Sequence, residues 1–506
     1  MPEKPNILVF MADHLMGDVT KKDHPCITPN LDRFGDEGVR FESTFCTAPH
    51  CCPSRASFQT GELPSKHGVW NNVSNRCAIS QKLNDGVKTL GEYLKEAGYG
   101  LGYSGKWHVS EWRGPADLGW ENFYPNREYG PNPKIESRLA KYDELAKQPK
   151  NIPVTEGTLQ RPGWGNLQYY GTHESGPDHP PGREITEGIR GLRTLAERGE
   201  PWAMMISTNV PHDPHVAPSK YVDMYADREV KLPPSWMDDL KDKPRIYQRM
   251  RYQTWAQMSE AEATECLKRF WAKCTMVDDW FGRIMAALEE TGQADNTLVI
   301  FTSDHGDYAG AHGLWAKGIP AFREAYSIPG IVRWKNGVKN PGRVVDELVS
   351  ICDFMPTILE AATGAAPDVF GRSLLPFLRD EKEIRWRDAM VGQCNGVELY
   401  YTQRSVWTKD WKLVYNGFDF DELYDRRNDP GETVNLADPE RYPQNGRTAG
   451  ESFVPWPRLT PELERVREEM YARLWTFARE NEDHFLYTPY ITTSQAAYGP
   501  LLAVRR

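Results

Sequence analysis

Four short apolar segments, far apart in the chain, each lead directly into titratable side chains. In order, these are residues 6–10 followed by Asp13 and His14, residues 101–108 with Lys106 and His108, residues 202–207 followed by His212 and His215, and residues 296–307 with Asp304 and His305. Each segment is typical of a buried strand. Because open α/β sheets bind ligands at the carboxyl ends of their strands, the pattern predicts an α/β fold in which four distant segments build one site.

Helices are predicted between these strands. Residues 28–38 have Thr28 as a cap, Pro29 as the first helical residue and Gly38 as the stop. Residues 264–291 carry a long apolar stripe at helical spacing. Both helices fit an α/β core.

The stretch 48–61, APHCCPSRASFQTG, places two cysteines side by side. Neighbouring cysteines do not form a disulfide without strain. Proline is tolerated in the first turn of a helix, so we expect a helix to begin at Pro53, with Cys51 just before its N-terminus. Free N–H groups and the helix dipole favour an anion there, which makes Cys51 a suitable place for a reactive group.

The bulk properties of the chain exclude several classes of protein. Its 506 residues are enough for a large core and a smaller second unit. The net charge of −10 argues against a general polyanion binder, so nucleic acid is not an expected partner. No run of 18 apolar residues is present, so no association with a membrane is expected. Nine cysteines, an odd number in a long chain, predict reduced thiols and no disulfide framework.

The N-terminal residues show no signal-peptide cleavage pattern. This predicts a cytoplasmic protein, or a periplasmic or secreted one if a leader has been removed. Residues 110–200 and 213–258 are irregular, and we interpret them as insertions that shape a substrate pocket. The first of them is rich in aromatic side chains, among them Trp112, Trp120, Tyr129, Trp164, Tyr169 and Tyr170.

The chain changes character after about residue 385. Residues 404–417 alternate like strands of an antiparallel sheet, and residues 461–480 form an amphipathic helix. We therefore expect a catalytic domain over residues 1–385 and a smaller C-terminal subdomain with a tail over residues 386–506.

The stretch around the paired cysteines resembles the signature of the sulfatase family. Its elements are Cys51, Pro53, Ser54 and Arg55, followed by Thr60 and Gly61. In that signature the cysteine is oxidised after translation to formylglycine. One register fits, in which Cys51 is converted and Cys52 fills the free position. Gln59 departs from the family, which usually has an aliphatic residue there.

The resemblance extends over nearly the whole chain. Residues 28–41 look like the first helix of the family, 105–108 like its lysine–histidine pair, 304–317 like its second metal segment with a catalytic lysine, and 422–436 like part of its C-terminal subdomain. It implies an alkaline-phosphatase-like fold. In this fold a large, mostly parallel sheet is flanked by helices, and a smaller α+β subdomain is built on an antiparallel sheet.

The resemblance also implies a divalent metal, usually calcium (Ca²⁺). By position, its ligands are Asp13, His14, modified Cys51, Asp304 and His305. His14 stands where most sulfatases have a second aspartate, and His305 where many members have asparagine and some have histidine. Two imidazoles make the site softer, so manganese (Mn²⁺) is a second candidate. A His14 ring that faces away from the metal is the other reading of that position.

Catalytic roles follow from the same resemblance. Hydrated formylglycine attacks sulfur with one hydroxyl and later expels sulfate with the other. Arg55 orients it, Lys106 and Lys317 bind the sulfate oxygens, and His108 is the base for the second step. His212 and Lys317 are candidate donors to the leaving oxygen. His215 either serves beside His212, contacts the substrate or is a loop histidine.

The residues favour one function over several others. The expected function is removal of sulfate from a sulfated carbohydrate, because CCPSR followed by residues 67–72, HGVWNN, is similar to sulfatases of N-acetylglucosamine 6-sulfate. The expected maturation partner is a formylglycine-generating enzyme. A phosphonate monoester or phosphodiester hydrolase of the same superfamily is the first alternative, and Lys106 with His108 argues against it. An aryl or choline sulfatase and a sulfate-binding protein without turnover are the others.

Overall fold

An eight-stranded sheet forms the centre of the computed structural model. In spatial order its strands are β13 (Arg343–Val345), β2 (Val39–Phe41), β12 (Gly330–Arg333), β11 (Thr297–Ser303), β1 (Asn6–Asp13), β9 (Trp202–Pro211), β4 (Gly100–Gly105) and β5 (Glu121–Pro125). β12 pairs antiparallel with both of its neighbours, and the other pairs are parallel. The predicted α/β class with a large, mostly parallel sheet is confirmed.

The structure describes most of the chain. The described residues are 4–125, 129–130, 143–144, 146–147, 154–161, 165–176, 181–397, 399–438, 459–487, 493 and 496–504. Within them, no helix has the length and apolar character that a membrane crossing needs. All nine cysteines are unpaired, as the sequence predicts.

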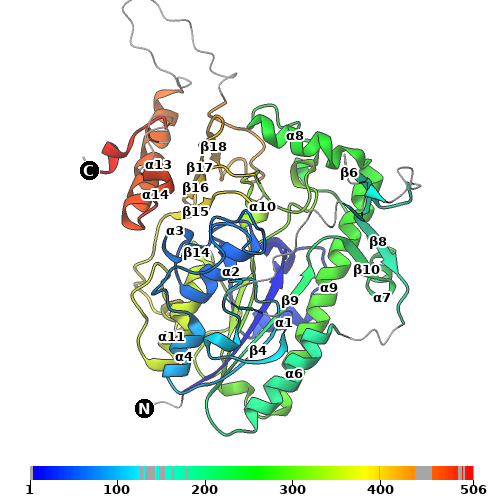
Figure 1. The fold of residues 1–506 in the computed structure, drawn as a ribbon, viewed down its shortest axis with the longest axis vertical. Helices are drawn as coiled ribbons and strands as arrows, with labels where there is room; N and C mark the ends of the chain where they lie inside the picture. The colour runs from blue at the N-terminus through cyan, green and yellow to red at the C-terminus, as the bar shows by residue number, and fades with distance from the viewer. Residues whose placement is uncertain are drawn as a thin grey trace, which may run out of the picture.

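Helices cover both faces of the sheet (Figure 1). One layer contains α1 (Pro29–Asp36), α6 (Arg183–Ala196) and α9 (Glu260–Glu290), and the other contains α2 (Cys51–Thr60), α4 (Leu90–Glu96) and α11 (Phe354–Thr363). β1 is buried along its whole length, as a central strand covered on both faces must be.

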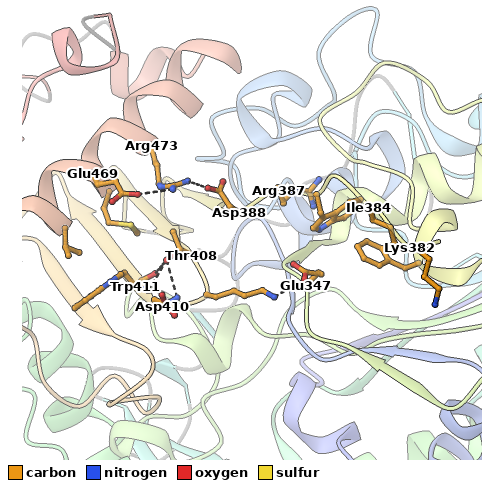
Figure 2. Close-up of a pocket in the computed structure, with 15 residues that line it drawn as sticks. Glu347, Lys382, Ile384, Arg387, Asp388, Thr408, Asp410, Trp411, Glu469 and Arg473 are labelled. Atoms are coloured by element: carbon orange, nitrogen blue, oxygen red, sulfur yellow. Dashed lines mark hydrogen bonds and ion pairs between the residues drawn. The ribbon is translucent and has the colours of Figure 1, made fainter. Parts of the chain in front are cut away.

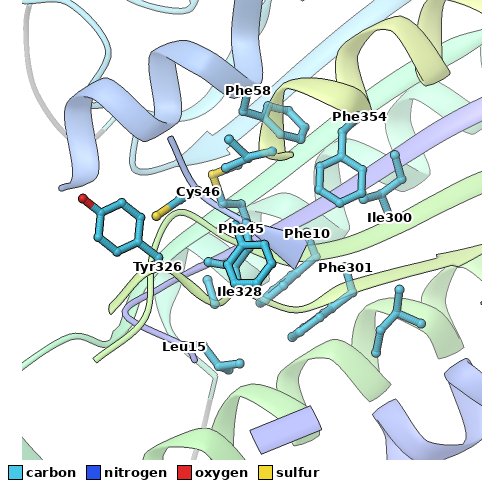
Figure 3. Packing of buried hydrophobic residues seen from close by; sticks show 14 of the residues in the cluster. Phe10, Leu15, Phe45, Cys46, Phe58, Ile300, Phe301, Tyr326, Ile328 and Phe354 are labelled. Atoms are coloured by element: carbon cyan, nitrogen blue, oxygen red, sulfur yellow. The ribbon is translucent and has the colours of Figure 1, made fainter. Parts of the chain in front are cut away.

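Aromatic side chains join the sheet to its helices. Phe10 of β1 stacks on Phe301 of β11 with ring centroids 5.4 Å apart, and Phe281 of α9 packs edge-on against both rings. Phe58 of α2 and Phe354 of α11 meet with ring centroids 6.1 Å apart (Figure 3). Such contacts fix where the first turn of α2 lies relative to the ends of the strands.

One predicted helix boundary is wrong by two residues. α2 begins at Cys51, with His50 as its N-cap, and not at Pro53. The early start is permitted because proline in the first turn lacks only an N–H that has no partner in the helix anyway. The predicted boundaries of α1 are confirmed, because Thr28 is its N-cap, Pro29 its first residue, and Gly38 follows the C-cap.

A second sheet begins with β15 (Met390–Cys394). It continues through β16 (Gln403–Trp407), β17 (Trp411–Asn416) and β18 (Glu422–Asp425), and all three pairs are antiparallel. α13 (Pro461–Glu480) packs against β16 and β17. The antiparallel sheet and its helix match the predicted C-terminal subdomain. The boundary between residues 385 and 386 stays a prediction.

The remaining elements are short. They are the helices α3 (Pro64–His67), α7 (Ser219–Val222), α8 (Arg245–Gln253), α10 (Arg323–Tyr326), α12 (Leu375–Leu378) and α14 (His484–Tyr487), and the strand pairs β10 (His215–Pro218) with β8 (Tyr170–His173), β14 (Val349–Ser350) with β3 (Thr44–Phe45), and β6 (Thr158–Arg161) with β7 (Gly165–Gln168).

Gly105, the last residue of β4, has a backbone that admits no side chain. Its φ is +98°, and a Cβ there would lie 1.8 Å from the carbonyl oxygen of Ser207 on β9. We expect Gly105→Ala to lower the free energy of unfolding by roughly 3 kcal/mol or more, because it combines backbone strain with overpacking. Urea unfolding followed by circular dichroism measures this.

Gly199→Ala is the matched control. Its φ is +73°, but nothing lies within 4 Å of a Cβ there. Gly199→Ala should therefore lower the free energy of unfolding by only about 1 kcal/mol, which is the cost of a left-handed backbone for alanine. Equal losses in the two variants would contradict a steric role for Gly105.

Candidate active site

Cys51 is the first residue of α2, and its side chain faces a cluster of polar groups. Its Sγ lies 3.3 Å from Nε2 of His305 and 3.8 Å from Oδ1 of Asp13. Cys52 belongs to the hydrophobic core, and its Sγ accepts a hydrogen bond from the backbone N–H of Val73. Of the two adjacent cysteines, Cys51 alone faces these groups.

Four of the five predicted metal ligands lie together. Ligand atoms of Asp13, Cys51, Asp304 and His305 are all within 4.8 Å of one another, and all four residues are buried. Two carboxylates and an imidazole suit a divalent cation. The Sγ of Cys51 stands where an oxygen of formylglycine would lie, so the donor set fits both the metal and the modified residue.

Arg55 lies one turn after Cys51 and is almost completely buried. Its Nε donates to Oδ2 of Asp304 at 2.7 Å, and its Nη1 donates to Oγ of Ser207 at 2.7 Å and to the carbonyl oxygen of Lys106 at 3.1 Å. Its Nη2 is buried without a hydrogen-bond partner. A buried donor left over beside Cys51 fits an additional oxygen at that position.

Lys106 follows Gly105 at the end of β4 and forms an ion pair with Oδ2 of Asp13. Burial, the largest single influence, would raise the pKa of Asp13, but the positive charges around it, Lys106 first among them, together hold that pKa well below its usual value. Asp13 is therefore an anion at neutral pH, as a metal ligand must be.

The same positive charge acts on Cys51. Burial, the largest influence, raises the pKa of the thiol, and the Asp13 carboxylate adds to this. The positive charges around the thiol, among them Lys106, Lys317 and His305, together outweigh both, so the pKa of Cys51 lies well below its usual value. The site stabilises negative charge at the position of this side chain.

His108 lies beyond Lys106, with φ +53°. Its Nε2 is 3.3 Å from Oγ of Ser74, and its Nδ1 is buried without a partner. Burial lowers the pKa of His108 to about 4, although the negative charge of a Cys51 thiolate raises it. A neutral imidazole next to Cys51 can accept a proton there.

Lys317 and His212 lie together on the other side of the cluster. The Nζ of Lys317 contacts Nε2 of His14 and lies 3.2 Å from Nε2 of His212. The rings of His14 and His212 are 3.9 Å apart between centroids. A second possible ligand group contains Asp13, His14 and His212, so His14 is outside the group that holds Cys51.

His215 is fully buried and is the first residue of the strand β10. Its ring packs against Tyr169 and Phe270, and its Nε2 lies 3.8 Å from Oδ2 of Asp307. It sits behind Asp307 while the side chain of His212 is 33% exposed. His212 is thus the more accessible of the two histidines.

Two residues of the site are not among those predicted. Oδ1 of Asp213 lies 3.1 Å from Nδ1 of His212, and Lys273 of α9 donates to the carbonyl oxygens of His212 and Pro214 at 2.5 and 2.9 Å. The sequence signal for Asp213 is its place directly after His212. The signal for Lys273 is a charged residue inside an apolar helical stripe. Both hold the segment that carries His212.

The C-terminal sheet holds the segment after Lys317. Gln403 of β16 donates to the carbonyl oxygen of Ile319 at 3.0 Å, and Lys412 of β17 donates to that of Ala321. The backbone N–H of Ala321 donates to the hydroxyl of Tyr247 at 3.3 Å. These bonds fix the backbone that presents Lys317 to the site.

The predicted aromatic insertion has a mixed outcome. Trp120, Tyr169 and Tyr170 are buried, and Trp112 is 39% exposed beneath the ammonium of Lys82. Trp164 lies outside the described residues. Trp112 is therefore the described tryptophan of this insertion that a ligand can reach.

A cavity of about 720 Å³ lies elsewhere, between α13, β16 and β17 and the segment 382–388. Figure 2 shows Arg473 between Asp388 and Glu469, and Lys409 also reaches Glu347 at 3.0 Å. These cations are neutralised by carboxylates, and none of the candidate catalytic residues lines the cavity. It is not the candidate active site.

Comparison with known families gives the identification. The sulfatase family model matches residues 5–365, and the model described as N-sulphoglucosamine sulphohydrolase, C-terminal, matches residues 310–449. The chain belongs to the sulfatase family. It is therefore a hydrolase that acts on sulfate esters, and its fold is alkaline-phosphatase-like.

Individual sulfatases and related hydrolases are similar over most of the chain. It is 32% identical over 458 residues to the uncharacterized sulfatase YidJ of Escherichia coli strain K12. The match covers 87% of this chain and 84% of the relative. It is 27% identical over 500 residues to an N-acetylglucosamine-6-O-sulfatase of Bacteroides thetaiotaomicron. That match covers 87% of this chain and 84% of the relative. A phosphonate monoester hydrolase from Silicibacter pomeroyi has a TM-score of 0.71 at 22% identity, covers 98% of this chain and 100% of its own, and so shares the fold.

The buried ion pair between Arg55 and Asp304 generates a prediction. Arg55→Met should lower the free energy of unfolding by about 3–5 kcal/mol when a chelator is present, because the Asp304 carboxylate then has no counter-charge. Urea unfolding measures this.

Lys335→Met is the control, since it breaks an ion pair with Asp295 in which both side chains are more than half exposed. Its stability should be close to that of the wild type. If Arg55→Met were as stable as this control, the prediction would be contradicted, because the carboxyl group of Asp304 would then be neutral in the folded protein.

Proposed function

We propose that this sulfatase removes sulfate from a sulfated carbohydrate, with formylglycine derived from Cys51 as its nucleophile and a bound Ca²⁺. The observation that carries the proposal is the buried group of Asp13, Cys51, Asp304 and His305 beside an unpartnered Nη2 of Arg55. A nucleophile, a cation site and a spare donor meet there at the N-terminus of α2.

Asp13, Asp304 and His305 would hold the cation together with the modified residue 51. When bound, the cation neutralises sulfate oxygens and lowers the pKa of the attacking hydroxyl. Oxygen donors predominate in this set, which favours Ca²⁺, and the imidazole keeps Mn²⁺ as the second candidate.

Formylglycine hydrated by one water would supply two hydroxyls on one carbon. One would lose its proton as it forms the bond to sulfur and the ester oxygen leaves as the alcohol; loss of the proton of the other would release sulfate as the aldehyde re-forms. Arg55 orients this group through its rigid donor fork. Lys106 binds a sulfate oxygen and stabilises charge that develops in the transition state. His108 takes the proton of the second hydroxyl, and its low pKa keeps the imidazole free to do so.

Lys317 and His212 serve the leaving group. As the bond between sulfur and the ester oxygen breaks, that oxygen gains negative charge and needs a proton. An alcohol of a sugar is a poor leaving group, so such a donor is worth roughly 10²–10⁴ in rate. The side chain of His212 is partly exposed, so a substrate can reach it from solvent.

A sugar substrate is favoured by two observations. The stretch HGVWNN after the nucleophile is similar to that of N-acetylglucosamine 6-sulfate sulfatases, and a relative that matches most of the chain is named for that activity. Lys106 and His108 both face Cys51, which favours sulfate over phosphonate esters. Aryl and choline sulfates complete the set to be tested.

The first test concerns Cys51. Protein made together with a formylglycine-generating enzyme should contain formylglycine at position 51 and a thiol at position 52, as peptide masses will show. It should then release sulfate from N-acetylglucosamine 6-sulfate. Cys51→Ala should abolish turnover and keep the thermal melting temperature.

Cys52→Ala is the matched control and should keep both the modification and most of the turnover. An intact thiol at position 51 in the co-expressed protein would contradict the nucleophile. Activity on phenyl phosphonates or phosphodiesters alone would favour the alternative hydrolase instead.

Removal of the metal gives a further prediction. A chelator should reduce turnover to background, because the two buried carboxylates and the nucleophile then lack their cation. Adding Ca²⁺ should restore it, and one Ca²⁺ per chain should be measured by elemental analysis. Restoration by Mn²⁺ alone would overturn the choice of calcium.

A further inference from the structure

The side chain of Asp307 lies behind the leaving-group side of the site and is fully buried. Its Oδ1 accepts hydrogen bonds from the backbone N–H groups of Ala309 at 2.8 Å and Ala316 at 3.0 Å. Ala316 directly precedes Lys317. One carboxylate oxygen therefore ties the start of this loop to the residue next to the lysine.

The other oxygen of Asp307 faces the ring of His14. Oδ2 lies 3.1 Å from Nδ1 of His14 and 3.8 Å from Nε2 of His215. Oδ1 of Asp213 is farther from the same Nδ1, at 3.9 Å. The ammonium of Lys317 can only donate to Nε2 of His14, so a neutral ring carries its proton on Nδ1 and donates it to this carboxyl oxygen. A neutral imidazole that carries its proton on Nδ1 has its lone pair on Nε2.

That lone pair points at Lys317. Nε2 of His14 contacts Nζ of Lys317, an ammonium that can only donate. His14 does not belong to the ligand group that contains Cys51. Asp307 thus touches both the backbone next to Lys317 and the ring that receives its ammonium.

We propose that Asp307 is a positioning residue for Lys317, and that it acts by fixing His14 with its Nε2 lone pair toward the lysine. His14 then serves the lysine and not the cation. This inference rests on the proposed role of Lys317 as a donor to the leaving oxygen. In this arrangement Nε2 of His14 accepts one N–H of the Lys317 ammonium, and a second N–H of the same ammonium stays directed at the leaving oxygen.

Asp307→Asn tests this with little change of shape. The amide keeps an oxygen for the N–H groups of Ala309 and Ala316, but it presents NH₂ to Nδ1 of His14. Nδ1 must then accept, so the ring proton moves to Nε2 and points at the ammonium of Lys317. Selective ¹⁵N-histidine NMR should show the Nδ1–H tautomer of His14 in the wild type and the Nε2–H tautomer in the variant.

Kinetics with two leaving groups gives the second readout. Asp307→Asn should lower kcat about 10²-fold or more for N-acetylglucosamine 6-sulfate, whose alcohol needs a proton. It should lower kcat much less for 4-nitrophenyl sulfate, whose phenolate leaves without one. Metal content and the mass of residue 51 should not change. His14→Asn, which keeps a donor near Asp307 but lacks Nε2, should show the same selectivity.

Asp238→Asn is the matched control, because Asp238 pairs with Nδ1 of His312 at 2.7 Å, is also largely buried, and contacts neither His14 nor Lys317. It should lose stability without any change in leaving-group preference.

Equal losses on both substrates in Asp307→Asn, or an Nε2–H tautomer in the wild type, would overturn the proposal. So would loss of the metal in His14→Asn. If the wild type hydrolyses no sulfate ester, the proposed substrate class fails while the NMR result still decides the role of Asp307.

Discussion

Charges buried without water must be paired, and this constraint organises the whole site. Asp13 and Asp304 end two neighbouring parallel strands and are completely buried. A carboxylate in that position is strongly destabilising unless a cation and hydrogen bonds accompany it. Lys106 comes from the next strand but one, and Arg55 from the helix above the sheet. The order of the strands in the sheet thus determines which charged side chains lie next to one another.

This pairing explains why the site is built for an anion although the chain as a whole is acidic. The positive charge is concentrated at one edge of the sheet, where Cys51 begins a helix whose dipole adds to it. The surroundings shift the pKa of that thiol downward. A sulfate ester therefore meets a local field that the net charge of −10 does not reveal.

Sequence patterns predicted the sheet and the convergence of its strand ends, because runs of apolar residues followed by titratable ones have few other uses. They placed the start of α2 two residues late, since a proline is equally acceptable in several positions of a first turn. Asp213 and Lys273 were not predicted as site residues, because their contacts depend on how a loop folds back onto α9. Periodicity does not encode that path. The orientation of His14 likewise depends on Asp307, which is distant in sequence.

The hydrogen bonds from the C-terminal sheet have a consequence for how the protein is made. Gln403 and Lys412 reach Ile319 and Ala321 across 84 and 91 residues of chain. During synthesis, the residues around Cys51 and Asp304 leave the ribosome long before these two side chains exist. A nascent chain can thus assemble the pocket around Cys51 early, while the segment that carries Lys317 is fixed only when the last sheet folds. The small subdomain thereby sets the moment at which Lys317 reaches its final position.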